Sequence, residues 1–151
     1  MALCVAAGIA VAAERGLPLP RFAALRSDEV NLRAGPGDRY PVEWVFTRKD
    51  LPVEIVQEWE HWRKIRDSEG TEGWVHQRML VGKRSVLITG ETRALYARPQ
   101  PGAAVVARAE PGVVGRLLEC KGTWCRIEAD KIEGWVHRDQ IWGVSATEAV
   151  P

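Results

Sequence analysis

The residues of this chain that could do chemistry are three cysteines, three histidines and scattered carboxylates. The histidines, His61, His76 and His137, are spread along the chain, and a surface position at a strand end is the simplest interpretation of each. The sequence has no Gly-x-Ser-x-Gly elbow, phosphate-binding loop, His-Glu-x-x-His pair or Cys-His-Asn order. We therefore expect a protein that is not an enzyme and that holds no metal and no cofactor.

Two of the cysteines stand close together in a stretch with the composition of a hairpin tip. Cys120 and Cys125 flank Lys-Gly-Thr-Trp, and a four-residue hairpin loop places its flanking residues opposite each other. Their Cα atoms are then about 5.5 Å or less apart, within reach of a disulfide. Two alternatives stay open: a redox pair, although the spacing is not Cys-x-x-Cys, and a metal site, although two thiols without further ligands make a poor one. We predict a structural disulfide.

The element that carries these cysteines is the second of two copies. Residues 62–76 read WRKIRDSEGTEGWVH, and residues 124–137 read WCRIEADKIEGWVH. A repeated run of alternating residues around a polar turn predicts one β-hairpin per copy. The glycine before the second tryptophan of each copy, Gly73 or Gly134, indicates a bulge or a close backbone crossing.

The two copies test the disulfide prediction against each other. Aligning them places Glu58 at the position of Cys120 and Arg63 at the position of Cys125. An ion pair in one copy and a cysteine pair in the other are expected if these positions face each other across two strands.

The rest of the chain is rich in short β-branched and aromatic runs that are separated by Gly, Pro and charged turns. This pattern predicts an all-β protein with five or six short strands in each copy. A single open sheet of this size buries too little apolar surface, so a small, strongly bent barrel of two packed sheets is the expected solution.

The N-terminus carries the only continuous apolar run, residues 3–13. This run is too short for a helix that spans a bilayer, but it has the length of a signal-peptide core and ends in small residues. We expect a signal-peptide helix and hence a periplasmic or secreted protein; a buried N-terminal helix stays open, because no Lys or Arg precedes the run. The net charge of +1 gives no field that would recruit nucleic acid.

The motif VNLRAGPG at residues 30–37, followed by an alternating strand, Trp-x-x-Ile and Gly-Trp-Val, resembles the bacterial SH3-like domain. The resemblance covers residues 30–76 in the first copy and about 113–137 in the second, whose entry loop departs from the pattern. It implies barrels that bind cell-wall peptidoglycan or peptides without catalysis. The expected organisation is a signal peptide at 1–13, a linker at 14–20, SH3-like barrels at 21–88 and 89–144, and a disordered tail at 145–151.

The tryptophans are the candidate ligand-binding residues. Trp62 lies three residues before Ile65, and Trp74 precedes Val75, so on regular strands each tryptophan points away from its aliphatic neighbour. If the aliphatic side chains enter the core, the tryptophans lie on the outer face; a bulge at Gly73 would instead turn Trp74 inward. The predicted groove beside the Gly-Pro-Gly loop is lined by Tyr40, Trp59, Trp62 and Trp74.

These expectations combine into two hypotheses of function. The first is a non-catalytic exported module that binds peptidoglycan or an extended peptide of the cell envelope through aromatic side chains. The alternative is a structural protein whose paired barrels dock on a larger envelope protein. The short connection at residues 82–91 favours a fixed pair of barrels, as this alternative requires.

Overall fold

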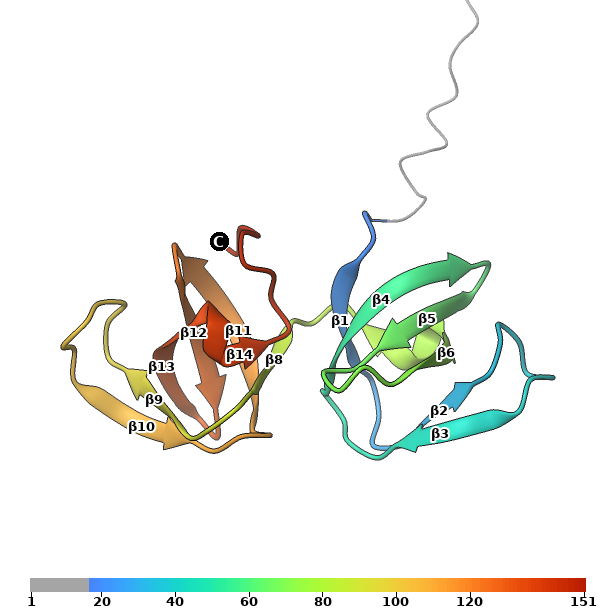
Figure 1. The fold of residues 1–151 in the computed structure, drawn as a ribbon, viewed down its shortest axis with the longest axis horizontal. Coiled ribbons are helices and arrows are strands. Elements are labelled where there is room, and N and C mark those ends of the chain that lie inside the picture. Colours follow the sequence, from blue (N-terminus) through green and yellow to red (C-terminus); the bar gives the residue numbers. More distant parts are fainter. Residues whose placement is uncertain (1–16) are drawn as a thin grey trace, which may run out of the picture.

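The computed structural model describes residues 17–151 and consists of two all-β modules joined by a short connection (Figure 1). The expected signal-peptide helix at 1–13 lies outside the described residues. We call residues 21–81 the N-module and residues 85–151 the C-module. Helical structure in the described range is limited to two single 3-10 turns, η2 (Gln77–Met79) and η3 (Arg138–Gln140). Over residues 17–151, then, the chain forms no helix of the length and apolarity that a bilayer span requires.

The N-module is one seven-stranded antiparallel sheet. Its strands, in spatial order, are β3 (Val42–Phe46), β2 (Val30–Arg33), β6 (Glu72–His76), β5 (Trp62–Arg66), β4 (Pro52–Trp59), β1 (Arg21–Leu25) and β7 (Leu80–Val81).

The C-module repeats this order strand for strand. Its sheet runs β10 (Val105–Ala109), β9 (Arg93–Tyr96), β13 (Ile132–His137), β12 (Trp124–Ala129), β11 (Val114–Lys121), β8 (Ser85–Ile88) and β14 (Ile141–Trp142). The two predicted hairpins are β5–β6 and β12–β13.

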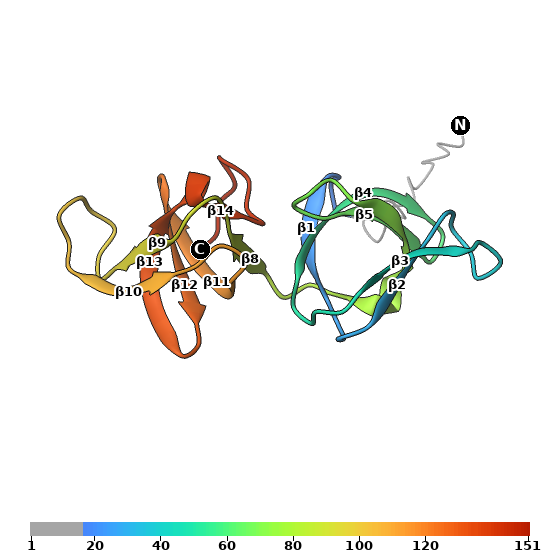
Figure 2. The ribbon, with the colours of Figure 1, turned by 60° about the horizontal axis from the view of Figure 1, so that its bottom comes forward.

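The expected closed barrels are corrected to open sheets that curl around a core (Figure 2). Among the described residues, the end strands β3 and β7 of the first sheet do not pair with each other, and neither do β10 and β14 of the second. Each sheet therefore buries its inner face by bending but keeps one long free edge, along β3 or β10.

Each module has its own apolar core on the inner face of its sheet. In the N-module the core includes Leu25, Leu32, Val53 and Ile65, which are fully buried. Burial of one such side chain contributes roughly 1.5–3 kcal/mol, so a handful of them supports a module of this size. The C-module has the equivalent set, with Val86, Ile88, Leu95, Ile127 and Val136.

The glycine of each hairpin marks a close crossing. A Cβ at Gly73 would lie 2.8 Å from the Cβ of Leu32, and one at Gly134 would lie 2.6 Å from the Cβ of Leu95. Neither glycine has a positive φ, so lack of space and not backbone conformation requires the glycine. The expected close crossing is confirmed in both copies.

The boundary between the modules differs from the sequence expectation of 88/89. Residues 85–88 form β8, which pairs with β11 and β14 in the second sheet. Each sheet needs a first strand, β1 or β8, that precedes the repeated motifs. This strand carries no motif of its own, so the sequence does not show to which module it belongs.

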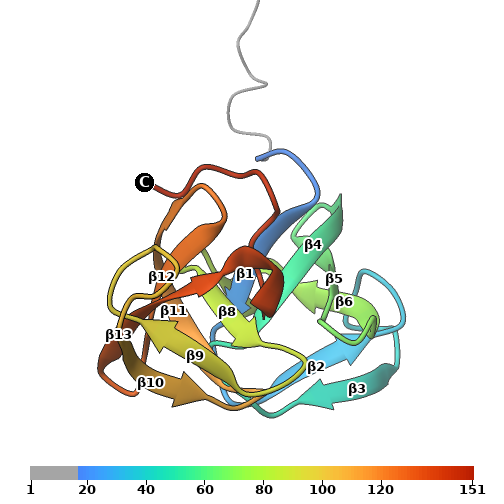
Figure 3. The ribbon, with the colours of Figure 1, turned by 60° about the vertical axis from the view of Figure 1, so that its left-hand side comes forward.

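The modules contact each other directly. The Phe22 ring packs edge-on against Trp142, with ring centroids 5.3 Å apart, and the Arg84 guanidinium lies over the same Phe22 ring. The hydroxyl of Ser85, a buried polar residue, donates to the Asp50 carbonyl at 2.6 Å. These contacts hold the two sheets side by side (Figure 3), as the short connection predicts.

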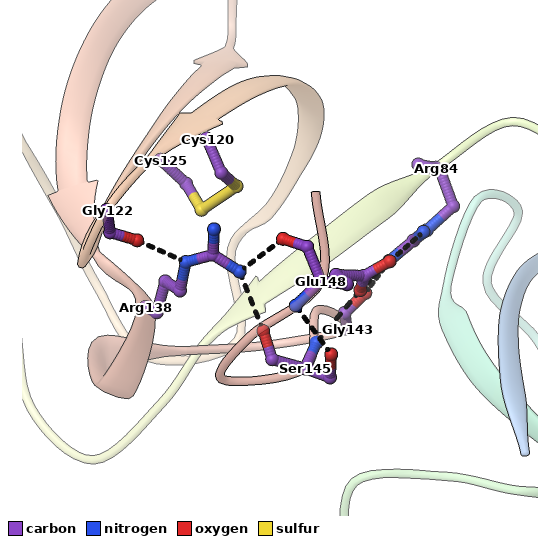
Figure 4. The surroundings of a disulfide bond; sticks show 8 residues. All are labelled: Arg84, Cys120, Gly122, Cys125, Arg138, Gly143, Ser145 and Glu148. Carbon is purple, nitrogen blue, oxygen red and sulfur yellow. Dashed lines mark hydrogen bonds and ion pairs between the residues drawn. A yellow bond between two sulfur atoms is a disulfide. The ribbon is translucent and has the colours of Figure 1, made fainter. Parts of the chain in front are cut away.

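Residues 145–151 were expected to form a disordered tail, but the structure places them against the C-module (Figure 4). Arg138 donates to the carbonyls of Ser145 and Glu148, at 2.9 and 2.8 Å. The Cys120 amide donates to the Val150 carbonyl at 2.8 Å, and Val150 packs on the core. The segment lacks large apolar residues, so its sequence gives no sign of backbone contacts such as these.

Candidate functional site

The exposed aromatic surface of the N-module is built at the tip of the β4–β5 hairpin. Trp59 and Trp62 are directly opposed across the strands, and Glu60, with a φ of 50°, and His61 complete the turn. Trp59 is 58% exposed, and Trp62 is half-buried. Together the two rings form an exposed apolar patch, and patches of this kind can mark binding sites.

Hydrogen bonds fasten this tip to η2. The Gln77 amide donates to the His61 carbonyl at 2.8 Å, and the Gln77 side-chain nitrogen lies 3.2 Å from His61 Nδ1. Arg63 Nη2 donates to Gln77 Oε1 at 3.0 Å. The two tryptophans are thus presented on a braced turn, which lowers the ordering cost of binding.

Two histidines complete the surface. The His76 ring lies edge-on to Trp62, with centroids 5.5 Å apart, and stacks with His61 at 6.1 Å. Its Nδ1 accepts a hydrogen bond from the Arg78 amide at 3.2 Å. Burial, and then the positive charge of Arg78, lower the pKa of His76, so the ring is neutral near pH 7. We call Trp59, Trp62, His61 and His76 the Trp59–Trp62 face.

Sequence reasoning missed the two histidines of this face, because 15 positions separate them in the chain. The signal that could have found them is the strand pairing itself: Trp62 is the cross-strand partner of His76. Any residue opposite the first tryptophan of the hairpin must share its outer face.

Trp74 lies where the outward interpretation puts it, but it is covered. It pairs with Lys64 on one side and Arg33 on the other, and it is absent from the apolar core cluster of the module. Its exposed fraction is 8%, so a ligand has little of the ring to contact.

Tyr40 belongs to the Gly-Pro-Gly loop. Its ring covers Gly35, where an added Cβ would lie 2.5 Å from Tyr40 Cδ1, and Arg33 Nη1 donates to the carbonyls of Asp38 and Tyr40 at 3.0 and 2.9 Å. Within the described range, no ring contact links Tyr40 to Trp59, Trp62 or Trp74. The structure therefore brings together two of the four predicted residues, Trp59 and Trp62.

The described residues show no metal centre. No group of three or more His, Cys, Asp or Glu side chains within residues 17–151 could hold a metal ion. The chemistry that the Trp59–Trp62 face offers is stacking on its rings and hydrogen bonding to its imidazoles.

The equivalent surface of the C-module is filled by its own side chains. His137 lies on Trp124 with ring centroids 3.7 Å apart, and Tyr96 packs edge-on against Trp124 at 5.7 Å. Trp124 is 9% exposed. Lys121 replaces Trp59 at the tip, and its ammonium lies over the Trp135 ring. Trp124 and His137 repeat Trp62 and His76 of the N-module, but the open surface is not repeated.

The predicted disulfide is present in the C-module. Cys120 and Cys125 are cross-strand partners whose Cα atoms are 4.0 Å apart and whose sulfurs are bonded. Glu58 and Arg63 face each other at the matching position and form an ion pair of 3.3 Å. The alignment of the two copies therefore predicted both pairs correctly.

Comparison with known proteins identifies the family of this chain. A family model described as the bacterial SH3 domain matches residues 26–82 and 89–143. A putative N-acetylmuramoyl-L-alanine amidase of Bacillus subtilis (strain 168) is 23% identical over 138 residues, 84% of this chain and 26% of that protein. The chain thus spans about a quarter of the length of this curated relative.

Two solved structures are similar at low scores. NlpC1 from Trichomonas vaginalis has a TM-score of 0.37 and 14% identity, covering 84% of this chain and 47% of that one. An NlpC/P60 family protein from Bacillus cereus ATCC 10987 has a TM-score of 0.36 and 15% identity, covering 80% and 55%.

Proposed function

Because the chain belongs to the bacterial SH3 domain family, we propose that it is a non-catalytic exported protein that binds cell-wall peptidoglycan or an extended envelope peptide through the Trp59–Trp62 face. The signal-like segment at residues 1–13 supports a periplasmic or secreted location. The name of the Bacillus subtilis relative, an amidase of N-acetylmuramoyl-L-alanine, supports a cell-wall ligand.

One observation carries the proposal: Trp59 is 58% exposed on a hairpin tip that hydrogen bonds fix to η2. Tryptophan combines a large flat apolar surface with an indole N–H donor, and it is enriched where proteins bind partners. The braced tip keeps Trp59 next to Trp62, so both rings are in place before a ligand arrives.

The face suits a ligand that has both apolar surface and hydrogen-bonding groups. Neutral His76 keeps one nitrogen on the Arg78 amide, and an imidazole in this state has a second nitrogen that can donate. A peptide or glycan that stacks on the tryptophans could accept that hydrogen bond. This proposal retains Trp59 and Trp62 from the predicted groove and gives Trp74 no direct contact.

Co-sedimentation with purified sacculi tests the proposal. We expect Trp59→Ala to weaken binding about thirtyfold or more, since hot-spot residues cost at least about 2 kcal/mol when truncated. Lys121→Ala, at the equivalent tip of the C-module, is the matched control and should bind as the unaltered protein does. Equal binding by both variants would exclude the Trp59–Trp62 face as the binding site, provided that circular dichroism shows both to be folded.

The second candidate function is the docking of the fixed module pair on a larger envelope protein. The inter-module contacts of Phe22 with Trp142 and of Ser85 with Asp50 favour it, because they give the two modules one common surface. Small-angle scattering of the intact protein and of Trp142→Ala tests this rigidity. A flexible pair in the unaltered protein would count against this candidate but would leave peptidoglycan binding by the N-module untouched.

A further inference from the structure

Both sheets have a free edge that exposes apolar side chains. β3 pairs only with β2, and β10 pairs only with β9, in the part of the chain that the structure describes. Such an edge presents unpaired backbone N–H and C=O groups, which can pair with another strand. These two strands also hold five of the nine large apolar side chains found exposed in residues 17–151: Val42, Trp44, Val45, Val105 and Val106.

The two edges carry complementary charges. Glu43 on β3 and Arg108 on β10 are both exposed, and within residues 17–151 neither has an ion-pair partner at 4.0 Å or closer. A free carboxylate on one edge strand and a free guanidinium on the other would attract each other if the two strands were paired.

One antiparallel alignment of the two strands brings the two unlike charges opposite each other. It places Val45 opposite Val106, Trp44 opposite Ala107 and Glu43 opposite Arg108. The alignment sets a large ring against a small side chain and a carboxylate against a guanidinium. Cross-strand pairs of these kinds are the ones that stabilise antiparallel sheets.

Trp44 and Ala107 also face the same way in their own sheets. Trp44 is the cross-strand partner of the core residue Leu32, and Ala107 is the partner of the core residue Leu95. Pairing β3 with β10 in this alignment therefore continues the inner face of one sheet into the inner face of the next.

These two strands cannot meet within one molecule. Figures 1 and 3 show β3 and β10 along the same lower edge, running toward each other. The turns that follow them are joined by a hydrogen bond from Arg48 to the Gly112 carbonyl. The strands are thus fixed end to end, and each leaves its edge open to another molecule.

We propose that this edge is a self-association surface on which β3 of one copy adds, antiparallel, to β10 of a second copy. One neighbouring molecule cannot pair antiparallel with both strands at once. Its own β3 and β10 also run toward each other, so facing the two edges would make both pairs of strands parallel. The contact is therefore head-to-tail, and such contacts grow open chains where the rotation does not close a ring. Two five-residue strands form a small interface, of the size found in weak, transient complexes.

Each strand also has a bulge, at Glu43 in β3 and at Val106 in β10, where the register of the pairing shifts. Bulges commonly twist an edge away from further pairing. We expect them to keep the association weak.

Sedimentation velocity over a concentration series tests the proposal on the full chain. We expect the weight-average mass to rise with concentration beyond that of a dimer. Glu43→Arg and Arg108→Glu should each weaken association about threefold to tenfold, since a cross-strand pair contributes up to about 1 kcal/mol and like charges reverse its sign. The double variant E43R/R108E should regain the association of the unaltered protein, because it restores opposite charges at the contact.

Mixing the two single variants provides the matched control. Each should associate poorly alone, whereas an equimolar mixture should associate as the unaltered protein does, because every contact between unlike variants then pairs opposite charges. Both side chains are exposed, so thermal melts should be unchanged. A monomer at every concentration, or single variants that associate normally, would overturn the proposal; association that stops at a dimer would instead indicate β3–β3 or β10–β10 pairing and would overturn it as well.

Discussion

The two modules link the same pair of cross-strand positions, in the β4–β5 and β11–β12 hairpins, with different interactions. In the N-module, Glu58 pairs with Arg63 at 3.3 Å and with Arg21 at 2.6 Å. In the C-module, the matching pair is the disulfide between Cys120 and Cys125. A carboxylate at this position can bind two guanidinium groups, whereas a cystine binds none, and this difference extends beyond the hairpin.

This difference determines the ion-pair partner of a nearby arginine in each module. Arg21 and Arg84 stand at equivalent positions. Arg21 is the cross-strand partner of Ile55, and the Arg84 carbonyl accepts a hydrogen bond from the amide of Leu117, the residue of β11 that matches Ile55. Arg21 stays within its own module on Glu58, whereas Arg84 binds Glu148 through both terminal nitrogens, at 2.9 and 2.7 Å. The disulfide thus leaves an arginine available for the C-terminal segment, which covers that side of the C-module.

The aromatic surfaces of the two modules also differ, because one is open and the other is covered. Trp62 of the N-module has His76 at its edge and stays half-open, while Trp124 of the C-module is covered by His137 and Tyr96. Duplication has yielded one module with an open surface and one that is closed and cross-linked. The hairpin motif, which both modules share, therefore specifies the fold. The residues around it decide whether the aromatic surface is accessible.

The largest effect is expected at the hairpin glycines. Gly134→Ala should destabilise the C-module by about 3 kcal/mol or more, because overpacking costs 1–3 kcal/mol and the new Cβ meets both Leu95 and Val106. Gly73→Ala should cost less, since its three nearest atoms all belong to the side chain of Leu32. Chemical denaturation measures both, with Gly82→Ala, in open space, as the control. Equal losses in the two modules would contradict the difference in crowding.

Removing the disulfide should come next. Cys120→Ser with Cys125→Ser should lower the free energy of unfolding by about 2 kcal/mol, the chain-entropy value for so short a loop. The reverse exchange sharpens the comparison: Glu58→Cys with Arg63→Cys should form a new disulfide at the matching position. We expect a smaller gain there, because Arg21 loses its partner. Denaturation of oxidised and reduced samples measures both, and an exchange that forms no disulfide would show that the two hairpins are not equivalent.

The ion pair itself should contribute less than the disulfide. We expect Glu58→Gln to cost about 1 kcal/mol or less, since partly exposed ion pairs contribute little and the Glu58 side chain is 26% exposed. A double-mutant cycle with Arg63→Ala measures the coupling. A loss as large as that of the disulfide would mean that Arg21 and Arg63 act on Glu58 as one buried network.

The smallest expected effect is a pH dependence that differs between the modules. Burial lowers the pKa of His76 below its ordinary value of 6.5, so the N-module is at full stability above that pH and loses stability as the pH falls through the lowered pKa. Hydrogen bonds from Arg84 lower the pKa of Glu148 below 4.5, and the C-module should lose this contribution only at more acidic pH.

Melting temperatures measured from neutral to acidic pH check this order. His76→Asn should remove the earlier loss, and Glu148→Gln should remove the later one. If the C-module segment detaches first on acidification, the assignment of these two groups is wrong.

The sequence predicted the strands well, because their signals are local. Residues 30–33, 42–46, 85–88 and 105–109, for example, are short runs rich in Val and other apolar residues, and each forms a strand. The cysteine pair and its Glu58–Arg63 counterpart followed from the alignment of two copies, which places residues across a hairpin without any knowledge of the fold.

What the sequence could not supply depends on contacts between distant segments. Trp74 has an outward position on its strand, yet it is covered once β2 pairs beside it. The tail at 145–151 has few apolar residues, and Arg138 holds it through backbone carbonyls that any sequence possesses. The free edges along β3 and β10 follow from sheets that curl without closing, and the strand patterns are the same for open and closed sheets.

The seven tryptophans allow a single NMR experiment to locate the ligand-binding surface. In an NMR titration with soluble peptidoglycan fragments, the indole N–H signals of Trp59 and Trp62 should shift, and those of Trp124 and Trp135 should not. That result would locate binding on the open module. Shifts at Trp124 or Trp135, or no shift at Trp59 and Trp62 while fragments bind, would contradict the account.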